Sequence, residues 1–87
     1  MSLAQTIEQR LSQFNPRSLE LVDESAHHIG HEGASGGGGH YSLTIVSDRF
    51  AGMTQVERHR QVYRALGPLM QKEIHALAIR ALTPDEL

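Results

Sequence analysis

The sequence has 87 residues, of which 39% are hydrophobic and 21% charged, and a formal net charge of −2. This length corresponds to one small domain, and the charge balance is not the strongly basic one of a dedicated nucleic-acid binder. The lack of cysteine excludes a disulfide framework and a cysteine zinc site. No apolar stretch approaches the roughly 20 residues of a membrane span and no signal-peptide pattern opens the chain, so we expect one domain over residues 1–87. The lack of cysteine fits a reducing compartment, and we expect a cytoplasmic location.

The first predicted element is a helix that opens at Ser2, where Gln5 is placed to complete a capping box. Asn15-Pro16 should end it, because a residue before proline avoids the helical region. Alternating apolar residues then predict a hairpin of two antiparallel strands, Leu19–Glu24 and Tyr41–Ser47. The apolar residues of the helix recur every three or four positions and predict one buried stripe: Leu3, Ile7, Leu11 and Phe14.

The segment between the two strands is rich in glycine and histidine. Six of the eight glycines lie between Gly30 and Gly39, which predicts a long mobile loop. The segment lacks the Gly-Lys-Ser/Thr ending and the following helix of a phosphate-binding P-loop. Gly30-His31-Glu32-Gly33 spells the GxxG clamp of KH domains, but that clamp lies between two helices, and Glu32 would repel phosphate. We therefore assign no phosphate site to the loop.

Asp48–Gly52 should be a turn anchored by Phe50, and Thr54 with Glu57 predicts a capping box that opens a second helix. Gly67-Pro68 should end this helix and leave a short further helix up to Glu73. We expect Arg58 and Arg60 to point away from the core and to form, with Arg64, a solvated basic strip or a docking surface. We expect His59 to be a partly buried structural residue. The predicted buried stripe is Val56, His59, Tyr63, Leu66 and Met70, with Val62 alongside.

The run Ile74–Leu82 alternates residue by residue and is mostly apolar on both faces, so we expect a strand buried on much of both sides. Thr83-Pro84-Asp85-Glu86 then supplies an N-cap, a proline and an acid, which predicts the start of a last helix. The expected fold is a small α+β domain with a three-stranded mixed sheet and helices on one face. Its last strand should be parallel to a strand of the hairpin.

The histidines are the side chains that offer chemistry near neutral pH. His75 begins the last strand, where its ring can reach the surface, and its position leaves a structural role and a ligand role open. The loop histidines could chelate zinc, copper or iron, or could lie idle in solvent: His27, His28, His31 and His40. With no cysteine and no serine in a nucleophile-elbow context, we expect no nucleophilic catalysis and no enzyme.

Several segments, at these spacings, resemble the BolA family between about Glu20 and Glu86. They are Asp23-Glu24-Ser25 with His28, Ile45-Val46-Ser47-Asp48-Arg49-Phe50-Ala51-Gly52, Arg58-His59-Arg60, Ile74-His75-Ala76-Leu77-Ala78-Ile79 and Leu82-Thr83-Pro84-Asp85-Glu86. The resemblance implies a class II KH-like fold of order αββααβα. It also implies a non-catalytic protein that partners a monothiol glutaredoxin, with glutathione, in iron–sulfur trafficking or iron sensing.

In that partnership a [2Fe–2S] cluster is shared. The glutaredoxin cysteine and glutathione hold one side, and the histidine matching His75 holds the other with a histidine of the first hairpin loop. His28 matches the second ligand best, and His31 and His40 are further candidates; the alternative for His40 is that it simply opens the second strand. Imidazole can replace thiolate on one iron, as in Rieske centres, so a chain without cysteine can take part.

The family is also associated with transcriptional regulation, stress response and cell shape, which implies a DNA-binding alternative. Zinc or copper uptake by the loop histidines alone is a third possibility. Without a partner we expect a monomer or a weak homodimer. The residues expected to contact DNA or a partner are basic: Arg58, Arg60, Arg64, Lys72 and Arg80.

Overall fold

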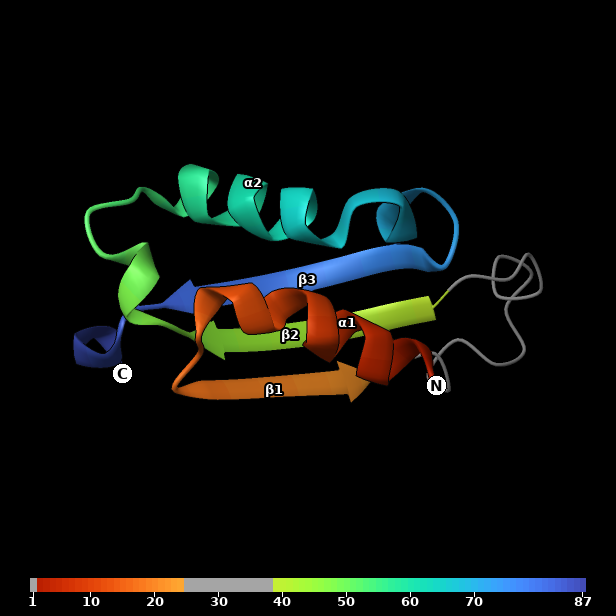
Figure 1. The fold of residues 1–87 in the computed structure, drawn as a ribbon, viewed down its shortest axis with the longest axis horizontal. Helices are drawn as coiled ribbons and strands as arrows, with labels where there is room; N and C mark the ends of the chain where they lie inside the picture. Colours follow the sequence, from red (N-terminus) through yellow and green to blue (C-terminus); the bar gives the residue numbers. More distant parts are fainter. Residues whose placement is uncertain (1, 25–38) are drawn as a thin grey trace.

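A computed structural model of the chain describes residues 2–24 and 39–87. The elements follow the order α1 (Leu3–Leu11), η1 (Ser12–Phe14), β1 (Ser18–Asp23), β2 (Gly39–Val46), η4 (Asp48–Phe50), α2 (Gln55–Leu66), η5 (Gly67–Gln71), β3 (Ile74–Leu82) and η6 (Pro84–Glu86). The three strands form one sheet of order β1-β2-β3, antiparallel between β1 and β2 and parallel between β2 and β3. Both α-helices lie on the same face of this sheet (Figure 1). The predicted α+β fold is therefore confirmed, with the short further helix and the last helix present as 3₁₀ turns.

The amino-terminal helix forms as its capping signals predict. The side chain of Ser2 accepts a hydrogen bond from the Gln5 backbone N–H at 3.1 Å, and the Gln5 side chain accepts one from the Ser2 backbone at 2.9 Å. Ile7 and Leu11 are fully buried. Asn15 ends the following 3₁₀ turn in the left-handed region, at φ 48°.

The core lies between the helices and the sheet face that they cover. Phe50 is fully buried and its ring centroid lies 5.3 Å from that of Phe14, which confirms its anchoring role. Ser47 is buried beside them and donates a hydrogen bond to the Phe14 carbonyl at 2.6 Å. The strands contribute every second residue to this core: Leu19, Leu21, Tyr41, Leu43, Ile45, Leu77, Ile79 and Ala81.

The predicted buried stripe of α2 is wrong at two positions and omits a third. Val56 is 59% exposed and Tyr63 is 42% exposed, whereas Arg58 is buried together with Val62 and Leu66, which the prediction included. These three residues are spaced by four, so they form a single stripe along the helix. The prediction left Arg58 out of the core because its side chain is charged. As a result, the expected buried face of the helix was rotated away from the observed one.

The predicted burial of β3 on both faces is also wrong. β3 is an edge strand, and its Ala76, Ala78 and Arg80 are exposed on the face that no helix covers. The pairing with β2 passes from Gly39↔Ile74 to His40↔Ala76, so His75 has no partner in the register. This bulge lets Ile74 point into the core, on the same side as Leu77.

No helix within residues 2–24 and 39–87 is long and apolar enough to cross a bilayer.

Candidate functional site: a histidine pair at one end of the sheet

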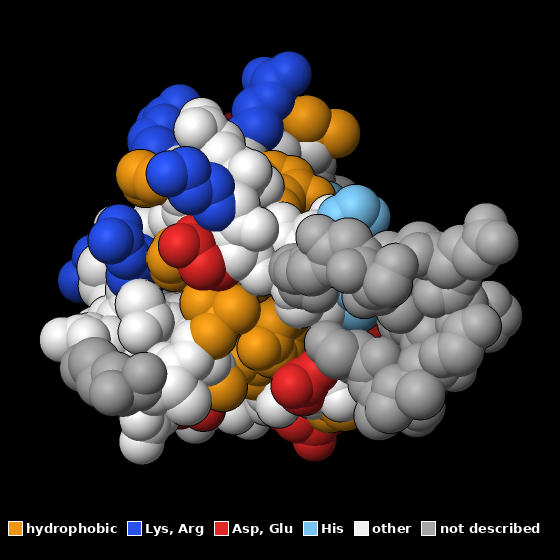
Figure 2. Space-filling model, turned by 90° about the vertical axis from the view of Figure 1, so that its right-hand side faces the viewer, with side chains coloured by type: hydrophobic (Ala, Val, Ile, Leu, Met, Phe, Trp, Pro, Cys, Tyr) orange, Lys and Arg blue, Asp and Glu red, His pale blue; other side chains and the backbone are white. Residues whose placement is uncertain are grey.

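Two imidazoles meet at the end of the sheet where β2 and β3 begin. The ring centroids of His40 and His75 are 5.0 Å apart, and the rings are stacked with an interplanar angle of 28°. His75 is exposed and His40 is half-buried. Figure 2 looks at this end of the molecule and shows histidine side chains beside exposed hydrophobic ones. Because parallel strands start at the same end of a sheet, residues 35 positions apart become neighbours.

The backbone around the pair is held by hydrogen bonds from both sides. Gly39 N–H donates to the Glu73 carbonyl at 2.7 Å, and Glu24 N–H donates to the His40 carbonyl at 2.7 Å. The bulge leaves His75 outside the regular pairing, where its ring faces solvent beside His40. The pair thus sits on a framework that β1, β2 and the segment before β3 fix together.

Packing also fixes Gly39. The Tyr41 ring lies over its α-carbon so closely that a side chain at residue 39 would overlap the ring. Tyr41 is 7% exposed, and burial, followed by the negative charge of Asp23, raises the pKa of its hydroxyl. Tyr41 therefore stays neutral at physiological pH and acts as an anchor for the start of β2.

The structure starts β2 at Gly39, two residues before the predicted start, so His40 belongs to the strand. The predicted loop spans 27–40, and its part up to residue 38, with His27, His28 and His31, lies outside the described residues. Their predicted roles stay predictions. Of the four candidate ligands, the structure brings together His40 and His75.

The described histidine pair supplies two imidazole donors, which is fewer than a metal centre needs. Within the described parts of the chain, no group of three or more His, Asp or Glu side chains is placed to hold a metal ion. Two neighbouring imidazoles with an exposed ring can occupy one side of an iron centre, as imidazole does in Rieske clusters. Further ligands would then have to come from the 25–38 segment or from another molecule.

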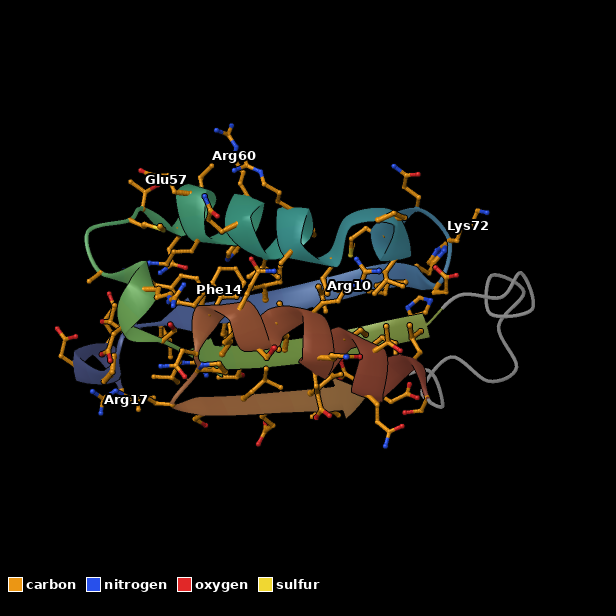
Figure 3. The ribbon with its side chains drawn as sticks, in the orientation of Figure 1. Arg10, Phe14, Arg17, Glu57, Arg60 and Lys72 are labelled. Atoms are coloured by element: carbon orange, nitrogen blue, oxygen red, sulfur yellow. The ribbon has the colours of Figure 1, made fainter. Side chains whose placement is uncertain are left out.

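The predicted basic residues do not share one surface. Arg60 and Arg64 are exposed on α2, Lys72 follows η5, and Arg80 lies on the sheet face opposite the helices. Figure 3 shows Arg60 pointing away from α2 and Lys72 near the histidine end. His59 is half-buried, as expected for a structural residue.

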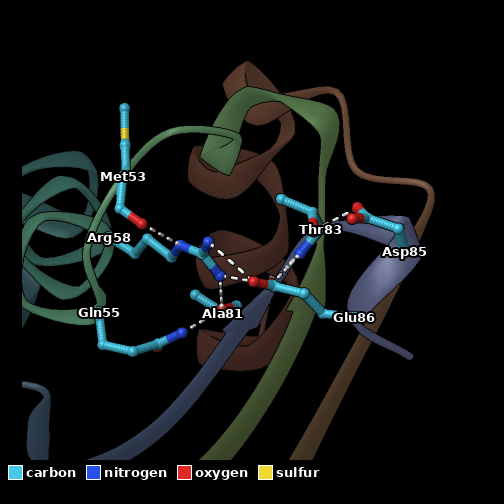
Figure 4. A network of polar contacts seen from close by, with 7 residues as sticks. All are labelled: Met53, Gln55, Arg58, Ala81, Thr83, Asp85 and Glu86. Carbon is cyan, nitrogen blue, oxygen red and sulfur yellow. Dashed lines mark hydrogen bonds and ion pairs between the residues drawn. The ribbon is translucent and has the colours of Figure 1, made fainter.

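Arg58 was expected to point outward, and this expectation is wrong. Arg58 is 5% exposed. Its guanidinium donates to the Met53 carbonyl at 3.1 Å and to the Ala81 carbonyl at 2.9 Å (Figure 4). Two further hydrogen bonds, of 2.6 and 3.1 Å, reach the Glu86 carboxylate. Arg58 therefore joins α2 to the end of β3 and to the carboxyl-terminal turn.

The same contacts set the ionisation of Glu86. Hydrogen bonds from Arg58, and then from the Thr83 backbone N–H, lower the pKa of the Glu86 carboxyl from 4.5 to about 2. The Thr83 N–H donates to the Glu86 carboxylate at 2.7 Å, and this hydrogen bond is one half of the capping box that the sequence predicts at this turn. The spacing of Arg58 with Val62 and Leu66 was the signal for its buried position.

Fold and site together define a small α+β domain with a histidine pair at the end of the sheet where β2 and β3 begin. A family model described as BolA-like protein matches residues 11–86, and the chain belongs to this family.

Two relatives and one solved structure illustrate the similarity. The chain is 43% identical over 89 residues to an uncharacterized protein in the cobS 5′ region of Sinorhizobium sp., with 99% of this chain and 96% of that protein covered. It is 36% identical to the DNA-binding transcriptional regulator BolA of Haemophilus influenzae, covering 99% of this chain and 82% of the relative. The BolA domain of SufE1 from Arabidopsis thaliana has a TM-score of 0.83 and 36% identity, with 100% and 99% of the two chains covered.

Proposed function

We propose that this chain is a non-catalytic partner of a monothiol glutaredoxin and supplies histidine ligands to a shared [2Fe–2S] cluster. The observation that carries this proposal is the exposed His75 ring, stacked at 5.0 Å on His40 at the end of the sheet. An exposed imidazole beside a second one is suited to ligation at a boundary between two proteins, where each supplies part of the coordination shell.

The absence of cysteine supports a divided set of ligands. Imidazole nitrogens from this chain would face one iron, while the glutaredoxin cysteine and the glutathione thiol would hold the other. When bound, the cluster supplies one-electron redox chemistry and can be passed on as cargo. The residues of this chain bind and orient: His75 is the proposed ligand, and the hydrogen bonds of Gly39 and Glu24 hold the backbone beside it.

The second ligand is one of three loop or strand histidines, and the geometry favours His40 because its ring already contacts His75. His28 and His31 are the alternatives implied by the family resemblance. In the cell, such a complex would serve iron–sulfur trafficking or iron sensing.

The test is a titration of the chain with a cluster-loaded monothiol glutaredoxin, followed by visible circular dichroism and by the mass of the complex. Wild type should form a heterodimer with a changed cluster spectrum. His40→Ala should weaken that change more than His28→Ala or His31→Ala. No heterodimer and no spectral change with wild type would refute the proposal, and metal uptake without any partner would favour the zinc or copper alternative.

A DNA-binding role is the second candidate. It is favoured by the name of the Haemophilus relative and by the exposed Arg60 and Arg64 on α2. Binding should weaken as salt rises, with a slope of about 0.9 per phosphate contact. Replacing both arginines by Gln should reduce that slope, and an absence of binding to DNA at physiological salt would reject this role.

A further inference from the structure

The face of the sheet opposite α1 and α2 carries an ordered set of side chains, of which the proposed cluster site uses one, His40. We call it the open face. The strand register aligns its residues in rows across β1, β2 and β3. Each row is written in the order β1, β2, β3, and the first row lies at the carboxyl end of β3. The rows are Ser18–Val46–Leu82, Glu20–Thr44–Arg80 and Val22–Ser42–Ala78, and the last, on β2 and β3, is His40–Ala76.

One row carries opposite charges at its two ends. Glu20 on β1 and Arg80 on β3 are both exposed, and Thr44 on β2 lies between them. Strands two positions apart are about 9–10 Å apart, so the two charges flank the central strand at equal distances. Within the described residues neither Glu20 nor Arg80 makes an ion pair.

The next row, Val22–Ser42–Ala78, has small side chains on two of its three strands, so another surface can come close to it there. Ser42 and Ala78 are small, and Val22 is 42% exposed, so one apolar side chain projects at the β1 edge opposite a short one at the β3 edge. Ala76, beside His40, is also small and exposed. Over these two rows the open face is therefore higher at Val22 on β1 than at Ala76 and Ala78 on β3.

We propose that the open face binds a second copy of this chain, with the two sheets packed face to face about a two-fold axis parallel to the strands. Such an axis places β1 of one copy over β3 of the other. Glu20 then faces Arg80 of the second copy, twice by symmetry, and each Val22 faces the low surface at Ala78. Two sheets aligned in this way, about 10 Å apart, are a common packing of antiparallel and mixed sheets.

The charges also discriminate between the possible symmetry axes. A two-fold axis across the strands, through this row, would place β1 over β1 and set Glu20 against Glu20 and Arg80 against Arg80. Like charges in contact across an interface are strongly unfavourable. The axis parallel to the strands is therefore the one that this surface supports, and Thr44 lies beside it.

This dimer is independent of iron–sulfur binding, and it has one consequence for that site. An axis parallel to the strands preserves their direction, so the His40–His75 pairs of both copies would lie at the same end of the assembly. Exposed ion pairs contribute little, so the association should be weak and should depend on salt.

Sedimentation equilibrium of the full chain at rising concentration tests the proposal. Wild type should show a reversible dimer. Glu20→Arg and Arg80→Glu should each weaken it by at least about tenfold, because each places like charges opposite one another. The double variant E20R/R80E should restore dimerisation, which a merely disrupted fold could not do. Arg60→Glu, on the outward surface of α2, is the matched control and should leave the dimer unchanged.

A second measurement uses the absence of native cysteine. Thr44→Cys lies beside the proposed axis and should be joined to its symmetry mate by a short bis-maleimide, whereas Arg60→Cys should not. A chain that stays monomeric at millimolar concentration overturns the proposal, as does a double variant that fails to regain the dimer. Efficient cross-linking at residue 60 but not at residue 44 would likewise reject this interface. These outcomes are read from mass, so they are separate from the spectral test of cluster binding.

Discussion

Replacing Arg58 by Met should destabilise the fold although the new side chain is apolar and of similar length. Arg58 is 5% exposed, and the substitution removes its hydrogen bonds to the Met53 and Ala81 carbonyls and to Glu86. The Ala81 carbonyl keeps a long hydrogen bond from Gln55, at 3.4 Å, and Glu86 can turn to water. The Met53 carbonyl loses the partner that Arg58 provides.

The expected magnitude follows from that loss. Leaving this part-buried acceptor without its partner costs up to about 1–3 kcal/mol in the free energy of unfolding. For a domain of this size, each kcal/mol lowers the melting temperature by about 4–8 °C. Methionine still fills the space, so little should be added for a cavity.

Urea unfolding followed by far-ultraviolet circular dichroism measures this difference. Arg60→Met is the matched control, because Arg60 is an exposed arginine two residues away on the same helix, and it should change stability by no more than about 0.5 kcal/mol. If both variants unfold at the same urea concentration, the reasoning about the Arg58 network is wrong.

Two further predictions concern Glu86 and Gly39. The pKa of Glu86 is lower in the folded chain, about 2, than its usual 4.5, so the unfolded chain binds more protons between these values. The Glu86 contribution should therefore be complete above about pH 4.5 and be lost as the pH falls towards 2. Urea midpoints measured from pH 2 to 6 should fall more steeply for wild type than for Glu86→Gln, and parallel curves would contradict this. Gly39→Ala should displace the Tyr41 ring and cost about 1–3 kcal/mol, visible as a lower melting temperature and a changed near-ultraviolet tyrosine signal; an unchanged signal would show that the ring does not need Gly39.

Local signals in the sequence predicted the elements well. The Ser2–Gln5 capping box, the break at Asn15-Pro16 and the span of β3 appear in the structure as expected. These features depend on neighbouring residues, so periodicity and capping rules are sufficient for them.

The errors arose where partners are distant in the sequence. Arg58 is acceptable in the core only because Glu86 and the Ala81 carbonyl, more than twenty positions away, are placed to receive it. Alternation alone could not show that β3 is an edge strand, because an exposed Ala reads like a buried one. The bulge at His75, which turns Ile74 inward, also depends on pairing with β2.

The candidate site was half visible in the sequence. The position of His75 at the start of a strand, together with the BolA resemblance, indicated that residue. The contact between His40 and His75 required the parallel register of β2 and β3, which brings both strand starts to one end.

The proposal of a shared cluster depends most directly on His75. The decisive measurement compares wild type, His75→Ala and His59→Ala in a titration with cluster-loaded monothiol glutaredoxin, followed by visible circular dichroism. His59, half-buried on α2, is the histidine control. We predict that His75→Ala abolishes the spectral change of the complex while His59→Ala retains it. A His75→Ala variant that reproduces the wild-type spectrum would contradict the central claim.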